Sequence, residues 1–313
     1  MAVSWQPLSA DTVAEWTELT NVLAEADGTE EFYDAEALAE ELEEPGVDPR
    51  LDTLGVWRDG VLAGFGQLRV PGGLFDGQAR AEIVGGVHPA HRGLGLGTEI
   101  MNRMEARAVE LAAQRHPGVP VMLRVSGGIE GASVRPMLER RGYRILRYYH
   151  EMSRPIPGVV PPPPELPVQP YSAEWEEAVR LAHNDAFSTH WGSIPMDPDR
   201  WSNLVGSRTF RPECSFFSVD SEGSVRAYVL VNQWVPGEAW VGLVGTRQQA
   251  RGAGLARACL AASLRAMAEQ GYAKACLGVD SQNASGAGAL YASLGFGLDR
   301  VIAHYGRLAP GRS

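Results

Sequence analysis

The sequence has little cysteine and no surplus of positive charge. Three cysteines occur in 313 residues (Cys214, Cys259 and Cys276), and they lack metal-ligand spacing. We therefore expect neither a disulfide framework nor a metal site. With 28 lysines and arginines against 38 acidic residues, the formal net charge is −10. This balance argues against nucleic-acid binding and mildly favours an amine partner.

Long hydrophobic runs are also missing. No apolar run approaches the roughly 18 residues that would span a bilayer, and no signal-peptide pattern opens the sequence. We expect a cytoplasmic protein without membrane contact. The composition, 44% hydrophobic and 21% charged, is typical of a folded protein, and the length suffices for two domains.

Proline is concentrated in one segment. Eight prolines fall between Pro155 and Pro170, which favours an extended conformation over helix or sheet. We predict an N-terminal domain at 1–154, a linker at 155–170 and a C-terminal domain at 171–313. The alternative is a long surface loop inside one domain.

Each half contains one copy of a glycine-rich segment. The first copy, at 85–98, reads GGVHPAHRGLGLGT, and the second, at 244–257, reads VGTRQQARGAGLAR. Each copy follows an apolar strand pattern and precedes an amphipathic helix. We read the halves as duplicates.

The surrounding patterns predict the same order of elements in both halves. In the first half they indicate helices at 10–26 and 35–44, and strands at 51–57, 61–70, 79–87, 121–125 and 143–151. In the second they indicate a helix at 173–187, and strands at 215–219, 225–235, 239–244, 274–279 and 298–307. Each half is expected to be an α/β domain with a mixed sheet.

A glycine-rich turn between strand and helix presents free backbone N–H groups at the positive end of the helix dipole, which suits a phosphate group. Arg92 and Arg251 can add a charged contact at the lip of each turn. A tight turn with good packing is the alternative for a single copy. Thr98 stands where a dinucleotide fingerprint requires glycine, and Gly-Lys-Ser/Thr is missing, so NAD and ATP fit less well.

These segments resemble the GCN5-related N-acetyltransferase (GNAT) superfamily. Its signature, Arg or Gln, two residues, Gly, one residue, then Gly or Ala, is matched by Arg92-x-x-Gly95-x-Gly97 and Arg251-x-x-Gly254-x-Ala256. The resemblance implies two tandem GNAT-like domains, each with a mostly antiparallel sheet flanked by helices. It also implies acetyl-CoA as cofactor, with its pyrophosphate on the loop and its pantetheine arm along the preceding strand end.

The cofactor-binding residues implied by the resemblance fall in both halves. In the second half they are Val244, Gly245, Thr246, Arg251, Gly252, Ala253, Gly254, Leu255, Ala256, Arg257 and Asn283. In the first half they are Gly85, Gly86, Val87, Arg92, Gly93, Leu94, Gly95, Leu96, Gly97 and Thr98.

The resemblance assigns catalysis to the second half. Family members commonly protonate the leaving thiolate with a tyrosine just before a Leu-Gly-Phe sequence, and Tyr291 stands there. The first half has Leu138 in the place of Tyr291 and Glu130 in the place of Asn283, so it lacks the acid. Packing on an amphipathic helix is the alternative role of Tyr291.

A base is expected because an alkylamine with a pKa near 10.4 costs about 4.6 kcal/mol to make neutral at pH 7. Glu238 is the candidate, although it lies two residues before the glutamate of the similar mycothiol synthase family. A shift of two keeps the same strand face. A solvated strand-end charge is the alternative, and Glu82 in the first half is out of register with Glu238.

Acceptor contacts are predicted from His190, Trp191 and Trp201, because aromatic residues in a loop can wall a pocket. Core packing is the alternative, and His190 can equally be a structural hydrogen-bonding residue.

We expect an N-acetyltransferase that moves an acetyl group from acetyl-CoA to a primary amine of a small molecule or peptide. Direct attack would occur in the second domain, and the chain is expected to be a monomer because the repeat can pair internally. Alternatives are a non-catalytic acyl-CoA sensor, a structural pseudo-dimer, or acetylation of a cysteinyl amine as in mycothiol synthases.

Overall fold

A computed structural model of the protein describes residues 3–157, 160–283 and 285–311. Within these ranges, no helix combines the length and apolar character needed to cross a membrane. The cysteines are buried free thiols.

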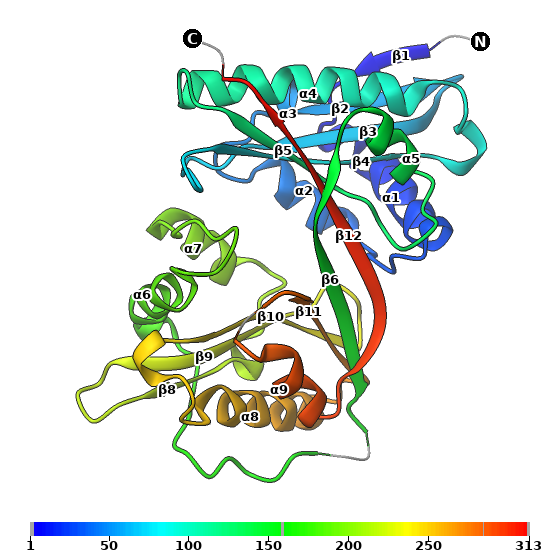
Figure 1. Ribbon diagram of the computed structural model, residues 1–313. Helices are drawn as coiled ribbons and strands as arrows, with labels where there is room; N and C mark the ends of the chain where they lie inside the picture. Colours follow the sequence, from blue (N-terminus) through cyan, green and yellow to red (C-terminus); the bar gives the residue numbers. More distant parts are fainter. Residues whose placement is uncertain (1–2, 158–159, 284, 312–313) are drawn as a thin grey trace. The chain divides into compact units, whose positions relative to one another are not determined.

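The chain divides into two compact units (Figure 1). The first comprises Met1–Tyr148 with Val301–Ser313, and the second comprises Tyr149–Arg300. Each is a mixed sheet with helices on both faces, which confirms the predicted α/β fold class.

The units differ from the predicted domain limits because two strands begin in one unit and end in the other. Strand β6 (Arg144–Pro155) leaves the first unit and pairs with β11 of the second. Strand β12 (Gly297–Ala309) leaves the second unit and pairs with β5 of the first. Local sequence patterns predicted both strands but carry no information about their partners.

The first unit contains most of the helices and strands of the first half. They are β1 (Val3–Gln6), η1 (Ala10–Thr12), α1 (Val13–Asp27), α2 (Ala35–Leu42), α3 (Pro49–Asp52), β2 (Thr53–Arg58), β3 (Val61–Arg69), β4 (Ala79–Val87), η2 (Pro89–His91), α4 (Leu96–Arg115), β5 (Val121–Ser126) and α5 (Arg135–Arg140). The strand order is β1-β2-β3-β4-β5-β12, and only the β4–β5 pair is parallel among these described pairs.

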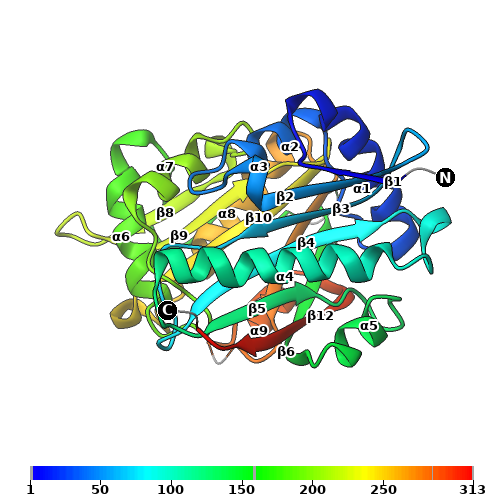
Figure 2. The same ribbon diagram turned by 90° about the horizontal axis from the view of Figure 1, so that it is seen from above.

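Helices cover both faces of this sheet. Helix α4 lies along β3, β4 and β5 on one face, and α1 and α2 cover the other (Figures 1 and 2). Ala79, Ala81 and Ile83 of β4 pack toward α4, as expected for alternate residues of a strand. Arg80 and Glu82 therefore lie on the opposite face.

The second unit repeats this plan. Its elements are β7 (Gln169–Pro170), η3 (Ala173–Trp175), α6 (Glu176–Phe187), α7 (Pro198–Gly206), η4 (Pro212–Cys214), β8 (Phe216–Val219), β9 (Val225–Asn232), β10 (Glu238–Thr246), η5 (Gln248–Ala250), α8 (Leu255–Glu269), β11 (Lys274–Asp280) and α9 (Ala287–Ser293). The strand order is β6-β11-β10-β9-β8-β7, and β10–β11 is its parallel pair. Helices α8 and α9 cover one face, and α6 and α7 cover the other (Figure 1).

Two short helices depart from the predicted pattern. The strand expected from Leu51 begins at Thr53, because Pro49–Asp52 forms α3, which Asp48 caps by accepting a hydrogen bond from the Arg50 N–H at 3.0 Å. Helix α7 lies where an aromatic loop was expected. Its N-cap, Asp197, accepts a hydrogen bond from the Arg200 N–H at 2.9 Å.

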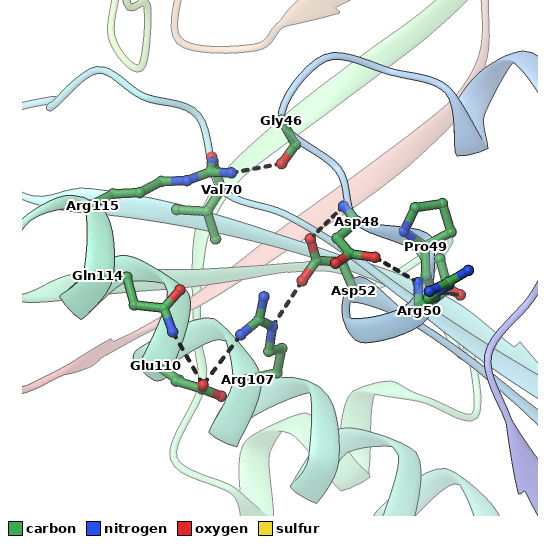
Figure 3. A network of polar contacts seen from close by, with 11 residues as sticks. Gly46, Asp48, Pro49, Arg50, Asp52, Val70, Arg107, Glu110, Gln114 and Arg115 are labelled. Atoms are coloured by element: carbon green, nitrogen blue, oxygen red, sulfur yellow. Dashed lines mark hydrogen bonds and ion pairs between the residues drawn. The ribbon is translucent and has the colours of Figure 1, made fainter.

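A buried ion pair fixes α3 against α4 in the first unit (Figure 3). The Asp52 carboxylate, 2% exposed, accepts a hydrogen bond from Arg107 Nε at 2.8 Å and one from the Asp48 N–H at 2.9 Å. Arg107 also contacts Glu110 at 3.3 Å. Because a buried carboxylate is costly unless it is paired, this contact holds α4 firmly at its middle. The same helix begins at the first glycine-rich turn.

The proline-rich segment has no helix or strand between residues 160 and 168. Two of its carbonyl groups accept hydrogen bonds from the second unit, Pro161 from Arg265 Nη1 at 3.2 Å and Pro167 from Ser218 Oγ at 3.0 Å. The segment therefore follows the surface of the second unit.

Candidate active site

The second unit opens where its two parallel strands part. Strands β10 and β11 pair from Glu238 with Lys274 to Val241 with Leu277, and β10 then continues to Thr246 paired with β9 alone among the described strands. The edge of β10 after Val241 therefore offers backbone N–H and C=O groups to a ligand lying along it. The predicted pantetheine-pairing residues 244–246 are on this open edge.

The first unit has the same opening. Strands β4 and β5 pair from Ala79 with Val121 to Ile83 with Val125, and the end of β4 up to Val87 pairs with β3. The predicted residues 85–87 lie on this open edge.

One feature distinguishes the two openings. Strand β10 has a β-bulge at Gly242, because Val241 pairs with Val231 while Leu243 pairs with Leu230. A bulge adds one residue and re-aims the strand. Strand β4 pairs with β3 without any register shift. Glycine within an apolar strand is the sequence signal that could have revealed the bulge.

Aligning β4 with β10 shows which residues of the two strands correspond to Glu82 and Glu238. The last parallel pairs, at Ile83 and Val241, match each other, so Glu82 corresponds to Trp240 and Glu238 corresponds to Arg80. Glu82 is in an ion pair with Arg124 at 2.8 Å.

The two glycine-rich turns have the same backbone conformation. Gly93 and Gly252 both have φ of 77°, and the helix N-caps Gly95 and Gly254 have φ of 80° and 79°. These positive φ angles favour glycine. The turns lead into α4 and α8, whose first N–H groups have no intrahelical acceptor. Both turns therefore have the backbone geometry of an anion site.

The arginines of the signature do not point their charge at the turn opening. Arg92 donates from Nε to the Val87 carbonyl at 3.0 Å and forms an ion pair with Asp27 at 2.7 Å. Arg251 donates from Nη2 to the Ala186 carbonyl at 2.9 Å. The charged contact expected at the lip of each turn is thus replaced. Arg92 instead contacts the end of α1, and Arg251 contacts the end of α6. The backbone of both residues remains a predicted cofactor contact.

Tyr291 lies on α9 in the apolar core of the second unit. The side chain is 7% exposed, and its ring meets that of Phe296 edge-on at 6.1 Å. Burial raises the pKa of Tyr291 to about 12, so the hydroxyl is protonated at neutral pH. Leu138 of α5 occupies the same place in the first unit, because the N–H of Tyr143 donates to Leu138 as that of Phe296 donates to Tyr291.

Asn283 and Arg257 fix the segments around Tyr291. The Asn283 side-chain oxygen accepts a hydrogen bond from the Ser285 N–H at 2.9 Å. Arg257, in the first turn of α8, donates to the Ser293 hydroxyl at the end of α9 at 2.6 Å. The first contact lies in the segment between β11 and α9, and the second joins α8 to α9.

Glu238 lies at the far end of the paired part of β10. Its carboxylate contacts Lys274 Nζ at 3.8 Å and the Cys276 thiol at 3.8 Å. Val241 is three residue steps further along the strand, which is roughly 10 Å. A base at Glu238 would therefore act on an amine at the opening only through water.

The predicted acceptor residues differ in burial. Trp201 is fully buried and packs against His183 with ring centroids 5.3 Å apart, so it is a core residue. His190 is partly buried, and its Nδ1 contacts the Trp191 carbonyl at 2.9 Å. His190 and Trp191 remain predicted acceptor contacts.

Sequence reasoning did not identify a buried pair of polar residues beside the opening. His183 Nδ1 and the Tyr228 hydroxyl share a hydrogen bond of 2.6 Å. They lie on α6 and β9, 45 residues apart, so no local pattern connects them.

Comparison with known proteins agrees with this geometry. The model of the acetyltransferase (GNAT) family matches residues 11–119 and 176–296. A mycothiol acetyltransferase from Streptomyces bingchenggensis (strain BCW-1) is 31% identical over 254 residues, covering 76% of this chain and 74% of that protein. One from Amycolatopsis mediterranei (strain U-32) is 27% identical, covering 96% and 97% respectively.

Solved structures share the fold of both units. A GCN5-related N-acetyltransferase from Sphaerobacter thermophilus has a TM-score of 0.77 at 24% identity, covering 99% of this chain and 96% of that one. A tandem GNAT protein from the clavulanic acid biosynthesis pathway has a TM-score of 0.68 at 17% identity, with both chains fully covered. The duplicated opening and turn, the family match and these relatives together show that the chain belongs to the GNAT acetyltransferase family and is an acyltransferase.

Proposed function

We propose that the second unit transfers an acetyl group from acetyl-CoA to a primary amine of a small molecule or peptide. The observation that carries this proposal is the coincidence, in one unit, of three features. They are the open edge of β10, the anion-binding turn before α8, and the buried Tyr291 hydroxyl on α9.

The residues present fit acetyl-CoA. The N–H groups of residues 252–257 at the start of α8 suit its pyrophosphate, and the edge of β10 at 244–246 suits the amide groups of its pantetheine arm. Glycine at 252 and 254 lets the backbone approach a phosphate without side-chain collision. When bound, acetyl-CoA supplies the thioester that the amine attacks.

Tyr291 is proposed as the proton donor to the departing thiolate. Its raised pKa keeps the proton on the hydroxyl until a strong base forms nearby. A thiolate released into the same apolar surroundings is also destabilised by burial, which raises its affinity for a proton and so offsets the raised pKa of Tyr291.

The first unit is proposed to be a scaffold that does not catalyse acetyl transfer. It retains the turn at Gly93 and Gly95, which supports binding of a second acetyl-CoA. It has Leu138 in place of the acid, and β4 lacks the bulge of β10.

A cysteinyl amine is the second candidate acceptor. The observation that favours it is the likeness to mycothiol acetyltransferases along almost the whole chain. Trp240 stands where that family is expected to have a glutamate, so the base in this protein would be a different residue.

Calorimetric titration of acetyl-CoA tests the proposal. The matched variants are Gly254→Glu and Gly95→Glu, which place a carboxylate at equivalent N-caps with equal backbone strain. We expect Gly254→Glu to abolish acetyl-CoA consumption with amines and Gly95→Glu to preserve it. Binding by wild type without consumption would support an acyl-CoA sensor instead, and no binding would reject the acetyltransferase proposal.

A further inference from the structure

A buried polar pair in the second unit lies next to the proposed site and takes no part in the chemistry described above. The pair is His183 and Tyr228, whose side chains are 5% and 0% exposed and share a hydrogen bond of 2.6 Å. Apolar rings surround it, including Phe187, which stacks on His183 with centroids 4.7 Å apart. A polar pair in such surroundings costs desolvation, so its presence calls for a physical reason.

The Tyr228 side chain supports the open part of β10. Tyr228 pairs with Gly245 across β9 and β10. A Cβ atom at position 245 would lie 2.4 Å from the Tyr228 ring and 2.7 Å from its hydroxyl oxygen. The ring therefore lies directly against the backbone of β10 where β11 no longer pairs with the strand.

His183 anchors that ring. Its burial, reinforced by the charge of Arg200, lowers the pKa of His183 to about 4, so the imidazole is neutral at pH 7. Burial likewise raises the pKa of Tyr228 well above its ordinary value, and the charge that Tyr291 would carry raises it further. The pair is thus a neutral hydrogen bond within electrostatic reach of the proposed acid.

The first unit serves as an internal comparison. Phe65 pairs with Gly86 as Tyr228 pairs with Gly245, so Phe65 occupies the position of the tyrosine. At Gly86, however, the nearest side chain is Leu23 of α1 and not the paired aromatic ring. Its Cδ1 lies 2.5 Å from the position of a Cβ atom there. Leu138 occupies the place of Tyr291. The unit without the acid therefore has apolar residues in the places of Tyr228 and Tyr291, and an apolar contact at Gly86.

We propose that the His183–Tyr228 pair is a positioning element of the acyl-transfer reaction. Its hydrogen bond fixes the Tyr228 ring against Gly245 and so sets the open edge of β10 relative to Tyr291. The proposal rests on the proposed function, because it assigns these residues to that same site.

The test replaces the polar pair by apolar residues, with phenylalanine at 228 as at the equivalent Phe65 of the first unit. The variants are Tyr228→Phe, His183→Leu and the double variant, with His183→Asn as the conservative change that keeps a polar atom near Nδ1. Tyr272→Phe is the matched control, because it removes another hydroxyl of this unit, one that donates to Gln233 at 3.0 Å. Melting temperature, the Kd for acetyl-CoA, and kcat are measured for each, with glucosamine, cysteine methyl ester and lysine amide as acceptors.

Stability and turnover are expected to separate in the double variant. Each single variant leaves one buried polar group unpaired and should lower the melting temperature by roughly 2–8 °C, whereas the apolar pair should recover most of this loss. We expect kcat to fall about tenfold in both single variants and to stay low in the double variant. The Kd for acetyl-CoA should stay within about twofold, His183→Asn should restore part of kcat, and Tyr272→Phe should leave it unchanged.

Recovery of kcat together with stability in the double variant would show a purely structural pair and overturn the inference, as would unchanged kcat in all variants. A wild-type protein that binds no acetyl-CoA, or consumes none with these amines, would overturn the proposed function and this inference together. The two failures are distinguishable because the second is seen in the wild type.

Discussion

Replacing Tyr291 with phenylalanine removes one oxygen atom from the proposed site and leaves its packing in place. The side chain is buried, and the edge contact with Phe296 at 6.1 Å needs only the ring. We expect kcat to fall about 10²- to 10⁴-fold, the usual contribution of a positioned acid, or roughly 3 to 5 kcal/mol of transition-state stabilisation. The Kd for acetyl-CoA should stay within about twofold.

The same substitution has a stability signature whose sign follows from the pKa. Burial raises the pKa of Tyr291 from 10.0 to about 12. A raised pKa means that the folded state holds the proton more tightly, so this contribution is fully present below pH 10 and is lost as the pH rises through 12. A difference of about two pKa units corresponds to roughly 3 kcal/mol. Denaturant unfolding at pH 8 and at rising alkaline pH should therefore show a steeper loss for wild type than for Tyr291→Phe.

Steady-state kinetics with acetyl-CoA measures the fall in kcat, and unfolding curves measure the pH-dependent loss of stability. Tyr272→Phe again provides the control, with kcat expected near that of wild type. If Tyr291→Phe retained most of its turnover while binding acetyl-CoA normally, Tyr291 would be a packing residue and the assignment of the acid would be refuted.

Three further predictions concern other contacts. Asp52→Ala should destabilise the protein by about 1 to 3 kcal/mol, because Arg107 of α4 loses its buried partner and keeps only the exposed carboxylate of Glu110, and chemical denaturation measures this. Gly245→Ala should lower both kcat and the melting temperature, because its Cβ would meet the Tyr228 ring at 2.4 Å, and unchanged kinetics would contradict that contact. Because the pKa of His183 falls from 6.5 to about 4, its contribution to stability is present above pH 6.5 and is lost as the pH falls through 4. Unfolding curves between pH 7 and 4 should show this loss, by roughly 3 kcal/mol, in wild type and not in His183→Leu.

Much of the fold could be predicted from the sequence because local patterns decide it. Apolar strand patterns located β4 and β10, and glycine at 93, 95, 252 and 254 marked the turns where positive φ is needed. The repeat then supplied the correspondence between the halves. The family assignment followed from these same residues.

The remaining features depend on tertiary contacts. The bulge at Gly242 is defined by which residues of β9 it faces, and the partner of Arg92 is Asp27, 65 residues earlier in the chain. Trp201 and His190 are both aromatic residues of one segment, yet only their packing shows that the first belongs to the core. Pairing between distant residues is not encoded in local spacing.

The strands that start in one unit and end in the other also bear on how this duplicated chain can be divided. Cleavage at Pro161–Pro164 would leave β6 on the amino-terminal fragment and β12 on the carboxy-terminal fragment. Each fragment would then carry a strand that completes the sheet of the other, because β11 pairs with β6 and β5 pairs with β12. The two fragments should therefore refold together as a complementing pair and not as independent modules, so neither repeat is a cassette that could be exchanged on its own.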